Sequence, residues 1–449
     1  APKFMLKIKV KKGHNINIAG VASSEILAPQ KNTTVSLSPE NFRYIKPKLL
    51  VKEGDSVKLG DPIFFDKLNP EIKWPAIASG KISKIIYGER RAIKEIIFNI
   101  DSDIENDSPN IDEKKLSNKE DVVNYLLEKN MWPFVTQRPF NKVANPSDNP
   151  KSIIVSLANT APLSVDYNFT LASNKDSIVS ALINLKKLTE GKLFVAVRPG
   201  EFKYLSDLDF IDMVEVEGPH PAGNVGVIIN HISPITSKDI VWTVQGHHLP
   251  ILGKLFSDGI FDPTMIINLS GPVVNNPSYF KSRIGASLES HCKGNLSVDK
   301  ARVISGDVLT GKESMMNGYL GFYHSSISVI EESFDRSFIG WLHPGGASKY
   351  SVFNAYLGGN KSPYSFTTLQ NGSHRAFVPI EAWEKVFPMD IYINALARSI
   401  EANDFEEMEQ LGIYECDEED VALCSFVCPS KTDVGAIIRK GLDTVYFDK

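Results

Sequence analysis

The stretch from Met213 to His231, MVEVEGPHPAGNVGVIINH, restricts the possible folds more than any other part of the chain. The apolar segment Val214–Val216 leads directly into Gly218–Gly223, in which two prolines and two glycines occupy six positions. This composition is incompatible with a helix or a central strand, so it predicts a rigid turn at the end of a β-strand. Because open α/β sheets bind their ligands at such strand ends, the turn is either a structural corner or a ligand contact that includes His220.

This turn does not have the form of a dinucleotide-binding loop. Such a loop offers backbone N–H groups to a pyrophosphate, and Pro219 and Pro221 lack that group. The strand predicted at 152–157 is followed by Ala158-Asn159-Thr160-Ala161-Pro162, which contains no glycine. A doubly wound sheet alone does not establish nucleotide binding, and the sequence therefore predicts neither NAD nor flavin on this chain.

Length and charge indicate a globular protein with several domains. At roughly 100–200 residues per domain, the 449 residues correspond to about three or four domains. The net charge of −5 does not favour nucleic acid as a partner. No apolar run approaches the ~18 residues of a membrane-spanning helix, and no leader peptide is recognisable. We expect a soluble chain, in the cytoplasm or peripheral on the cytoplasmic face of a membrane.

Residues 1–100 are predicted to form a small β domain. The segments 51–63 and 75–85 each read as strand, turn and strand, with glycines at the turns. The pair resembles the barrel-sandwich hybrid of biotinyl and lipoyl carrier domains. Carrier domains modify a lysine on an exposed hairpin, and Lys67 is the nearest candidate here, although most exposed lysines are simply solvated.

Four further regions follow. Residues 101–150 are predicted to be a linker, a helix opened by the capping box Ser117–Glu120 and an aromatic loop. Residues 151–260 alternate strands and helices, which predicts a Rossmann-like open sheet. Residues 261–330 are predicted to be a compact α+β unit, and residues 331–449 strands followed by helices. Three helices are expected in addition. One begins after Ser173 as its N-cap, one surrounds Trp383, and one spans Phe405–Leu411 and ends before Gly412.

The segment Met131–Phe140 carries three aromatic side chains and an arginine between prolines, in what is expected to be an irregular loop. A loop rarely exposes this much apolar surface unless the surface covers something. Trp132, Phe134 and Phe140 either fill a seam between domains, or they form a lid or docking surface for an apolar ligand with Arg138 as the polar anchor.

Motifs for metals and catalysis are weak. Cys416, Cys424 and Cys428 do not have the close spacing with which zinc and iron–sulfur sites begin, so buried thiols are expected. Two adjacent histidines, His247 and His248, point apart on a helix and indicate a helix start rather than a chelate. With no nucleophile elbow, HExxH or P-loop, the sequence predicts no metal site and no catalytic residues.

Several motifs together resemble one family, the A subunits of Na+-translocating NADH:quinone reductases. They follow one another in order and cover essentially the whole chain: Lys12-Gly13, the repeat at 51–85, Trp132 with Arg138-Pro139-Phe140, Gly218–Gly223, Gly271–Pro277, Arg302–Gly306, Asn371-Gly372-Ser373, Val378-Pro379-Ile380 and Asp417–Pro429.

The resemblance implies membership of a complex that transfers electrons from NADH to ubiquinone and pumps Na+. Its FAD, iron–sulfur centre, FMN and riboflavin would belong to partner subunits. The A subunit would face the cytoplasm, contact the B subunit in the membrane and take part in quinone binding. The family is also similar in layout to the flavin-bearing subunit of respiratory complex I, which implies a β-grasp (SLBB-like) domain at 261–330 and a helical C-terminal region.

We therefore expect a cofactor-free subunit that contributes to quinone binding and to assembly of the complex. Quinone or partner contacts are expected at Trp132, Phe134, Arg138, Phe140 and His220. The alternatives are a subunit with a purely structural scaffold role, and an independent flavin- or NAD-binding oxidoreductase, although the latter needs a nucleotide loop that the sequence does not contain.

Overall fold

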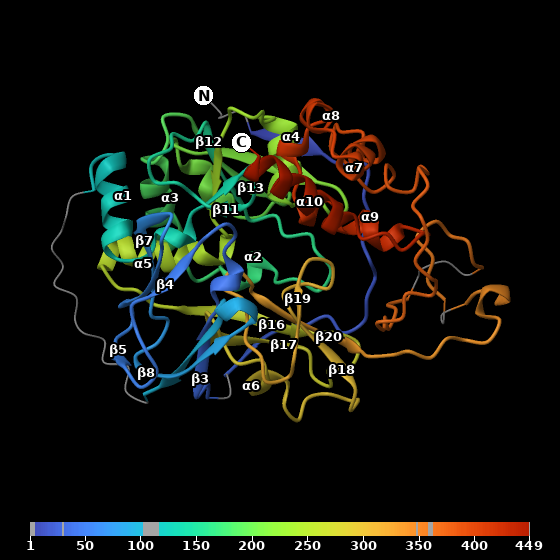
Figure 1. Ribbon diagram of the computed structural model, residues 1–449, viewed down its shortest axis with the longest axis horizontal. Helices are drawn as coiled ribbons and strands as arrows, with labels where there is room; N and C mark the ends of the chain where they lie inside the picture. The colour runs from blue at the N-terminus through green and yellow to red at the C-terminus, as the bar shows by residue number, and fades with distance from the viewer. Residues whose placement is uncertain (1–4, 29–30, 102–115, 347–348, 358–361, 449) are drawn as a thin grey trace.

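The computed structural model describes residues 5–28, 31–101, 116–346, 349–357 and 362–448. In this part of the chain, strands form four sheets, of seven, six, four and three strands. The sheets lie side by side, with a helical group at the C-terminal end of the chain packed against one of them (Figure 1).

The seven-stranded sheet contains the alternating strands and helices expected for 151–260. Its parallel strands stand in the order β14-β13-β12-β15, and β10 and β11 continue the sheet in antiparallel pairing beyond β15. The bounds are Thr136–Arg138 for β10, Lys142–Val143 for β11, Ser152–Ser156 for β12, Lys192–Val197 for β13, Asp212–Glu217 for β14 and Val241–Thr243 for β15. The crossover changes sides between β12 and β15, and the crevice at such a switch point is where open sheets bind ligands.

Helices cover both faces of this sheet because its strands are apolar on both sides. Ile153 and Val155 face α3 (Lys175–Lys186) and α5 (Leu249–Asp258) in one hydrophobic core. Ile154, between them in the sequence, packs into a second core with α4 (Val225–Ile232) and the C-terminal helices. The sheet thus joins two cores that pack on its opposite faces.

The barrel predicted near the N-terminus forms from two small sheets, ordered β3-β9-β8-β5 and β4-β6-β7. Their strands are β3 (Thr34–Leu37), β4 (Pro47–Leu49), β5 (Ser56–Val57), β6 (Pro62–Asp66), β7 (Asn69–Pro75), β8 (Gly80–Tyr87) and β9 (Ile93–Ile100). Trp74 and Phe64 stack in its core with ring centroids 4.7 Å apart. Lys67 lies exposed at the turn between β6 and β7.

Two strands ahead of the barrel belong to other sheets, unlike the single domain predicted for 1–100. Strand β1 (Leu6–Lys9) pairs in parallel with β14, and β2 (Ser23–Leu27) pairs in parallel with β17 (Ser278–Arg283). Local alternation of apolar and basic residues predicted a strand at 5–18, but it could not identify the partner, which lies about 200 residues away.

The six-stranded sheet is formed mainly by residues 264–331 and has the order β19-β18-β20-β16-β17-β2. Its remaining strands are β16 (Thr264–Ser270), β18 (Ala301–Ser305), β19 (Lys312–Ser314) and β20 (Ser326–Glu331), with the short helix α6 (Glu289–Cys292) beside them. Strand β18 ends at Ser305 and is followed by Gly306, which adopts a φ of 102°.

Four α-helices close the chain: α7 (Ile393–Ala402), α8 (Phe405–Gln410), α9 (Ala422–Val427) and α10 (Val434–Phe447). The stop of α8 before Gly412, which has a φ of 93°, is confirmed. The helix expected around Trp383 is wrong, since this residue lies in consecutive turns. Among the described residues, no helix combines the length and apolarity needed to cross a bilayer.

Two helix starts differ by one residue from the prediction. Helix α1 (Lys119–Glu128) is capped by Asn118, whose side chain accepts from Asp121 N at 2.9 Å, while Asp121 accepts from Ser117 N. Helix α3 follows Asn174 and not Ser173. In both places several capping residues stand side by side, and sequence alone does not select among them.

Candidate functional site

A cleft with a volume of about 1690 Å³ lies at the switch point of the seven-stranded sheet. Residues that follow β12 and β15, including Asn159, Tyr167 and His247, form its floor. The barrel, the six-stranded sheet and the C-terminal region contribute the walls, for example Arg43, His324 and Glu419 respectively. All major parts of the molecule therefore meet at this one cavity.

The turn at Gly218–Gly223 places His220 on the cleft wall. It directly follows β14, as predicted. His220 N donates to Asn15 Oδ1 at 2.9 Å, and His220 O accepts from His14 N at 2.9 Å, so the segment after β1 holds the turn. A Cβ on Gly223 would lie 1.6 Å from Ala158 O, which requires glycine at this close approach. The turn is thus both a structural corner and a wall of the cleft.

The hydrogen bonds around His220 favour one of the two positions for the ring proton. Gly223 N donates to Thr160 Oγ1 at 3.1 Å, and Thr160 Oγ1 lies 3.0 Å from His220 Nδ1. With its oxygen accepting from the backbone, the Thr160 hydroxyl can donate to Nδ1, and the proton of a neutral ring then resides on Nε2.

Two further histidines on the cleft repeat this arrangement. Ser305 Oγ accepts from Gly321 N at 2.8 Å and lies 2.8 Å from Nδ1 of His324. The hydroxyl of Tyr167 lies 3.0 Å from Nδ1 of His247. In each case a hydroxyl that donates to Nδ1 leaves Nε2 as the N–H donor.

These imidazoles are neutral at pH 7. Burial lowers the pKa of His220 to about 4, although Asp307 opposes the shift. Burial, and then the neighbouring His324, lower the pKa of His247 to about 3. The Nε2 atoms of His220 and His247 are buried and find no partner among the described residues. Such unsatisfied donors call for an explanation, and a ligand with carbonyl oxygens would accept from them.

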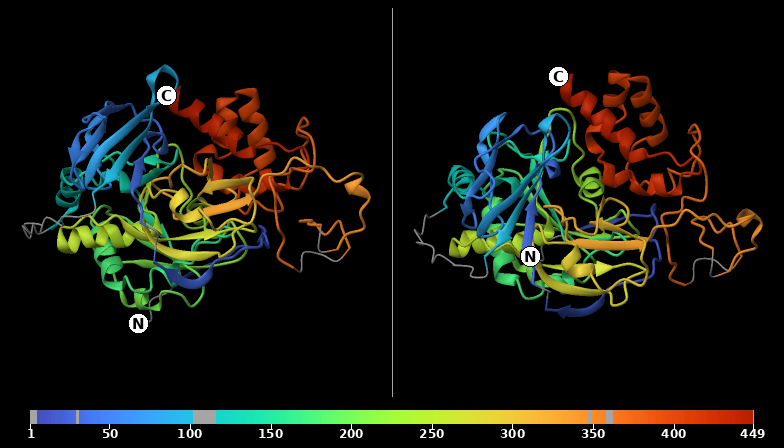
Figure 2. Two further views of the ribbon diagram at one scale, coloured as in Figure 1. Left: turned by 90° about the horizontal axis from the view of Figure 1, so that it is seen from below. Right: turned by 60° about the horizontal axis from the view of Figure 1, so that its bottom comes forward.

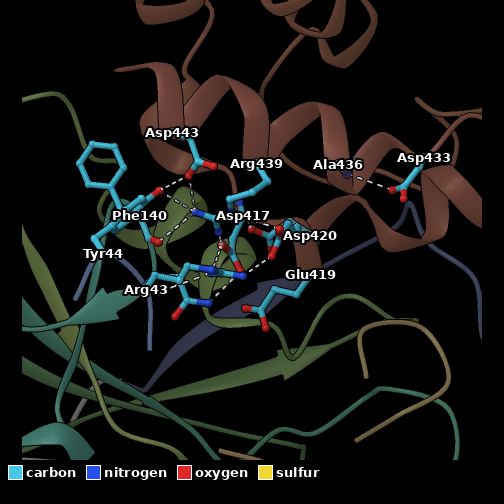
Figure 3. Close-up of polar contacts among 12 residues, drawn as sticks. Arg43, Tyr44, Phe140, Asp417, Glu419, Asp420, Asp433, Ala436, Arg439 and Asp443 are labelled. Atoms are coloured by element: carbon cyan, nitrogen blue, oxygen red, sulfur yellow. Dashed lines mark hydrogen bonds and ion pairs between the residues drawn. The ribbon is translucent and has the colours of Figure 1, made fainter. Parts of the chain in front are cut away.

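A cluster of arginines and carboxylates holds one side of the cleft together (Figure 3). Arg439 Nη2 lies 2.8 Å from Asp417 Oδ1, and Arg439 Nε lies 3.1 Å from Glu418. Arg43, from the barrel, contacts Glu418 and lies 3.5 Å from Asp417. Tyr44 donates to Asp443 at 2.5 Å and accepts from Arg439 at 3.1 Å.

Arg138 joins this cluster from the sheet. Its Nη2 lies 2.7 Å from Glu419 and 3.8 Å from Asp417. Burial opposes ionisation of Asp417, but Arg138, Arg43 and Arg439 together lower its pKa to about 2. Arg138 Nε and Nη1 are buried and have no partner among the described residues. The arginine predicted to anchor a ligand therefore ties the sheet to the C-terminal region.

The aromatic segment 131–140 is not an irregular loop. It forms a 3-10 turn at Trp132–Phe134 followed by strand β10. Trp132 is buried, with its Nε1 donating to Ala144 O at 2.7 Å. Phe134 is buried between His248 and Phe322, with ring centroids 4.8 and 4.9 Å away. Phe134 thus fills a seam between the α/β region and the segment that leads into β20, which was one of the two expected arrangements, while Trp132 packs on Trp242 of β15 with ring centroids 5.3 Å apart.

Phe140 is half-buried and packs on Tyr446 of α10, with ring centroids 5.1 Å apart.

Of the five predicted contact residues, His220 lies on the cleft wall. Sequence reasoning missed the partners of the histidines, namely Thr160, Tyr167 and Ser305, and also His324. Only Thr160 had a signal in the sequence that could have identified it. It lies in the glycine-free loop that follows the strand at 152–157.

The four cysteines are buried free thiols. Burial raises the pKa of Cys292 to about 12 and also raises the pKa values of Cys416 and Cys424 above the usual value of a thiol. Within the described ranges, no three histidine, cysteine or acidic side chains are grouped so that they could hold a metal ion. His247 and His248 lie in a 3-10 turn that leads into α5, which confirms the predicted helix start.

Comparison with protein families gives three matches along the chain. Residues 8–101 match the NqrA N-terminal barrel-sandwich hybrid domain, 117–261 the NqrA second alpha/beta domain, and 266–315 the NQRA C-terminal domain of the SLBB type. These matches confirm the barrel-sandwich, α/β and SLBB-like units in the predicted order.

Curated relatives match almost the full length. The Na(+)-translocating NADH-quinone reductase A subunit from Hahella chejuensis is 36% identical over 98% of this chain and 99% of its own length. Its namesake from Yersinia pestis is 36% identical over 96% and 98%, and that from Vibrio atlanticus 34% identical over 98% and 99%. An NAD+-reducing [NiFe]-hydrogenase structure aligns with 48% of the chain and 47% of its own, at 10% identity and a TM-score of 0.36.

Proposed function

This chain belongs to the family of Na(+)-translocating NADH-quinone reductase A subunits, and is thus a component of a translocase complex; from that starting point we propose that its cleft receives the ring of a quinone. The observation that carries this proposal is the set of neutral imidazoles on the cleft wall, with Nε2–H groups on His220 and His247 that lack partners among the described residues.

The chemistry of a quinone ring matches these groups. Its two carbonyl oxygens accept hydrogen bonds and carry no charge, so neutral N–H donors suit them better than cations that would need counterions. Pockets for small molecules are usually about 300–1,000 Å³, and the volume here, about 1690 Å³, accommodates a ring with part of its side chain. Trp132 and Phe134 are buried next to the cleft, where Phe134 packs on Phe322 of the cleft lining. Arg138 pairs with Glu419, which belongs to the C-terminal wall of the cleft.

Further parts of the proposal concern the setting of this chain in the complex. We place it on the cytoplasmic side of the membrane, next to the B subunit, with electron-carrying cofactors on partner subunits and ubiquinone as ligand. The strand order β14-β13-β12-β15 supports a Rossmann-like sheet, and the strands between 264 and 331 support a β-grasp unit. The loop after β12 has no glycine, and Ala158 O approaches Gly223 closely, so this switch point does not offer the open nucleotide loop of a dinucleotide enzyme.

A scaffold role is the second candidate function. It is favoured by the ionic cluster, in which Arg43 of the barrel, Arg138 of the sheet and Arg439 of α10 converge on Asp417. Such a cluster holds three regions in one arrangement without requiring a ligand.

Equilibrium binding of a short-chain ubiquinone to the isolated chain separates the two roles. We expect saturable binding that weakens about five- to tenfold in His220→Gln, as for loss of one hydrogen bond, and also in Thr160→Val, which removes the hydroxyl partner of Nδ1. His291→Gln is the matched control. His291 is also buried, with Nδ1 bonded at 2.9 Å and Nε2 unpartnered among the described residues, but it lies outside the cleft. Absence of binding to the well-folded chain would leave the scaffold role.

A further inference from the structure

The segment from 333 to 380, here called the arm, extends away from the rest of the molecule in its described parts, 333–346, 349–357 and 362–380. It follows β20, and among its described residues the one regular element is a 3-10 turn at Gly340–Leu342. Figures 1 and 2 show it projecting sideways beyond the sheets and the C-terminal helices. Long segments without secondary structure are uncommon in compact domains and are often functional.

The inner side of the arm is anchored by aromatic packing. Tyr350 and Phe366 contact each other with ring centroids 4.9 Å apart, and Tyr364 packs on Phe366 at 4.7 Å. Phe426 of α9 lies 6.0 Å from Phe366, and the hydroxyl of Tyr350 bonds to the His14 ring. The base of the arm therefore has a defined position, and Tyr350, Tyr364 and Phe366 line the cleft.

The arm also carries apolar side chains that the described residues leave largely exposed, of which Trp341 also borders the cleft. The side chains of Phe338, Phe334, Trp341, Leu357 and Leu342 are exposed by 93, 79, 77, 75 and 62% respectively. Single exposed apolar residues are normal on a protein surface, but a contiguous group marks a site of interaction.

The charge of the arm differs from that of the chain. Residues 333–380 contain one acidic residue, Asp335, and four basic residues, Arg336, Lys349, Lys361 and Arg375. The arm thus has a net charge of +3 in a chain of net charge −5. A surface with carboxylates around an apolar centre is complementary to it.

We propose that the arm is the docking surface for another protein of the same complex, one that presents an apolar face bordered by carboxylates. A lipid bilayer fits less well. Hydrocarbon cannot satisfy the backbone N–H and C=O groups of an irregular segment, whereas a protein surface can pair with them. Because the inner side of the arm lines the cleft, the docked partner also holds one wall of that cavity in place.

The test uses the whole complex, purified through an affinity tag on a different subunit. The variants Phe338→Ser and Leu342→Ser, together with Arg375→Glu, change exposed side chains of the arm that do not line the cleft. We expect at least a tenfold loss of this chain from the purified complex, increasing with salt concentration. Leu68→Ser is the matched control, since Leu68 is 58% exposed on the barrel, close to the 62% of Leu342, and it should be retained like the wild type.

Thermal unfolding of each purified variant shows whether the fold is intact, which we expect because the altered side chains are exposed. Wild-type retention of the arm variants would overturn the proposal. So would binding of the isolated chain to anionic phospholipid vesicles that is lost in the same variants, because it would assign the arm to a membrane. The quinone-binding test on the isolated chain does not depend on either result.

Discussion

Arg138 and Glu419 stand 281 positions apart in the chain, yet Nη2 of Arg138 lies 2.7 Å from Oε1 of Glu419. The pair connects an edge region of the seven-stranded sheet with the segment that leads into α9. Asp417 is the second carboxylate near the guanidinium, at 3.8 Å, and is itself buried. A buried arginine with two carboxylate neighbours determines how the C-terminal region sits on the cleft.

Replacing Arg138 by methionine should therefore destabilise the fold strongly. Removal of one partner leaves buried carboxylates uncompensated, which costs about 3–5 kcal/mol, and urea denaturation at pH 7 measures it. Arg302→Met is the control, since Arg302 forms a partly exposed pair with Glu332 and its loss should cost about 1 kcal/mol or less. Equal effects of the two variants would contradict a special role for the buried cluster.

Asp420 should make the protein less stable as the pH rises. It is 1% exposed, its Oδ2 accepts from Asp417 N at 3.0 Å, and its Oδ1 has no partner among the described residues. Burial, and then Glu419, raise the pKa of Asp420 well above its usual value. The folded state thus binds a proton that the unfolded state releases above about pH 4, so this contribution to stability falls from there upward.

The variant Asp420→Asn, which is always neutral, should remove that slope. Denaturation of wild type and variant between pH 4.5 and 7.5 should show the wild type losing stability relative to the variant as the pH increases. Asp417 acts in the opposite direction but at lower pH. Its pKa is lowered to about 2, so its contribution is present above the unfolded pKa of about 3.9 and is lost as the pH falls toward 2. Parallel curves for the two proteins would show that Asp420 is ionised in the fold.

Quinone affinity should not change between pH 5 and 8. Burial lowers the pKa of His220 to about 4 and that of His247 to about 3, so both rings stay neutral throughout this range. Below about pH 4, a proton on Nδ1 of His220 would displace the hydrogen bond from Thr160, and affinity should fall. Titration of a short-chain ubiquinone at several pH values measures this. A transition near pH 6.5, the ordinary value for histidine, would refute the neutral-donor arrangement.

Cys428 should react first among the four thiols. Burial raises the pKa of Cys428, but hydrogen bonds with Thr432 outweigh this and leave its pKa below the usual value. The pKa values of Cys292, Cys416 and Cys424 are raised by burial, and the thiolate is the reactive species. Brief alkylation followed by peptide mass spectrometry gives the order. Cys428→Ser should remove the fastest phase, and modification of Cys424 ahead of Cys428 would contradict the prediction.

The sequence predicted those parts of the fold that have a local signal. The apolar runs at 152–157 and 214–216 marked β12 and β14 close to their observed bounds. Strand β10 was missed because its three residues, Thr136–Arg138, are followed by Pro139, which indicates a turn when the partner strand is unknown. Helix α4 was missed because the apolar run Val225–Ile229 has no polar face to give a helical period.

The candidate site was less predictable because it is formed by contacts between distant parts of the chain. His220 could be singled out from the unusual turn around it, but its partner Thr160 lies 60 positions earlier. Ser305 and His324 carry no motif of their own. Arg138 was expected to anchor a ligand, and only the proximity of Asp417 and Glu419 reveals that carboxylates of the same chain surround it.

The placement of β1 and β2 has a consequence for synthesis. Residues 6–27 emerge from the ribosome well before the strands that pair with them, β14 and β17, the second of which ends at Arg283. At roughly 5–20 residues per second, the first strands wait about 10 to 50 s for their partners, while the barrel that follows them can already fold. The nascent chain thus carries an unpaired N-terminal segment for much of its translation, and closure of the two large sheets is a late event.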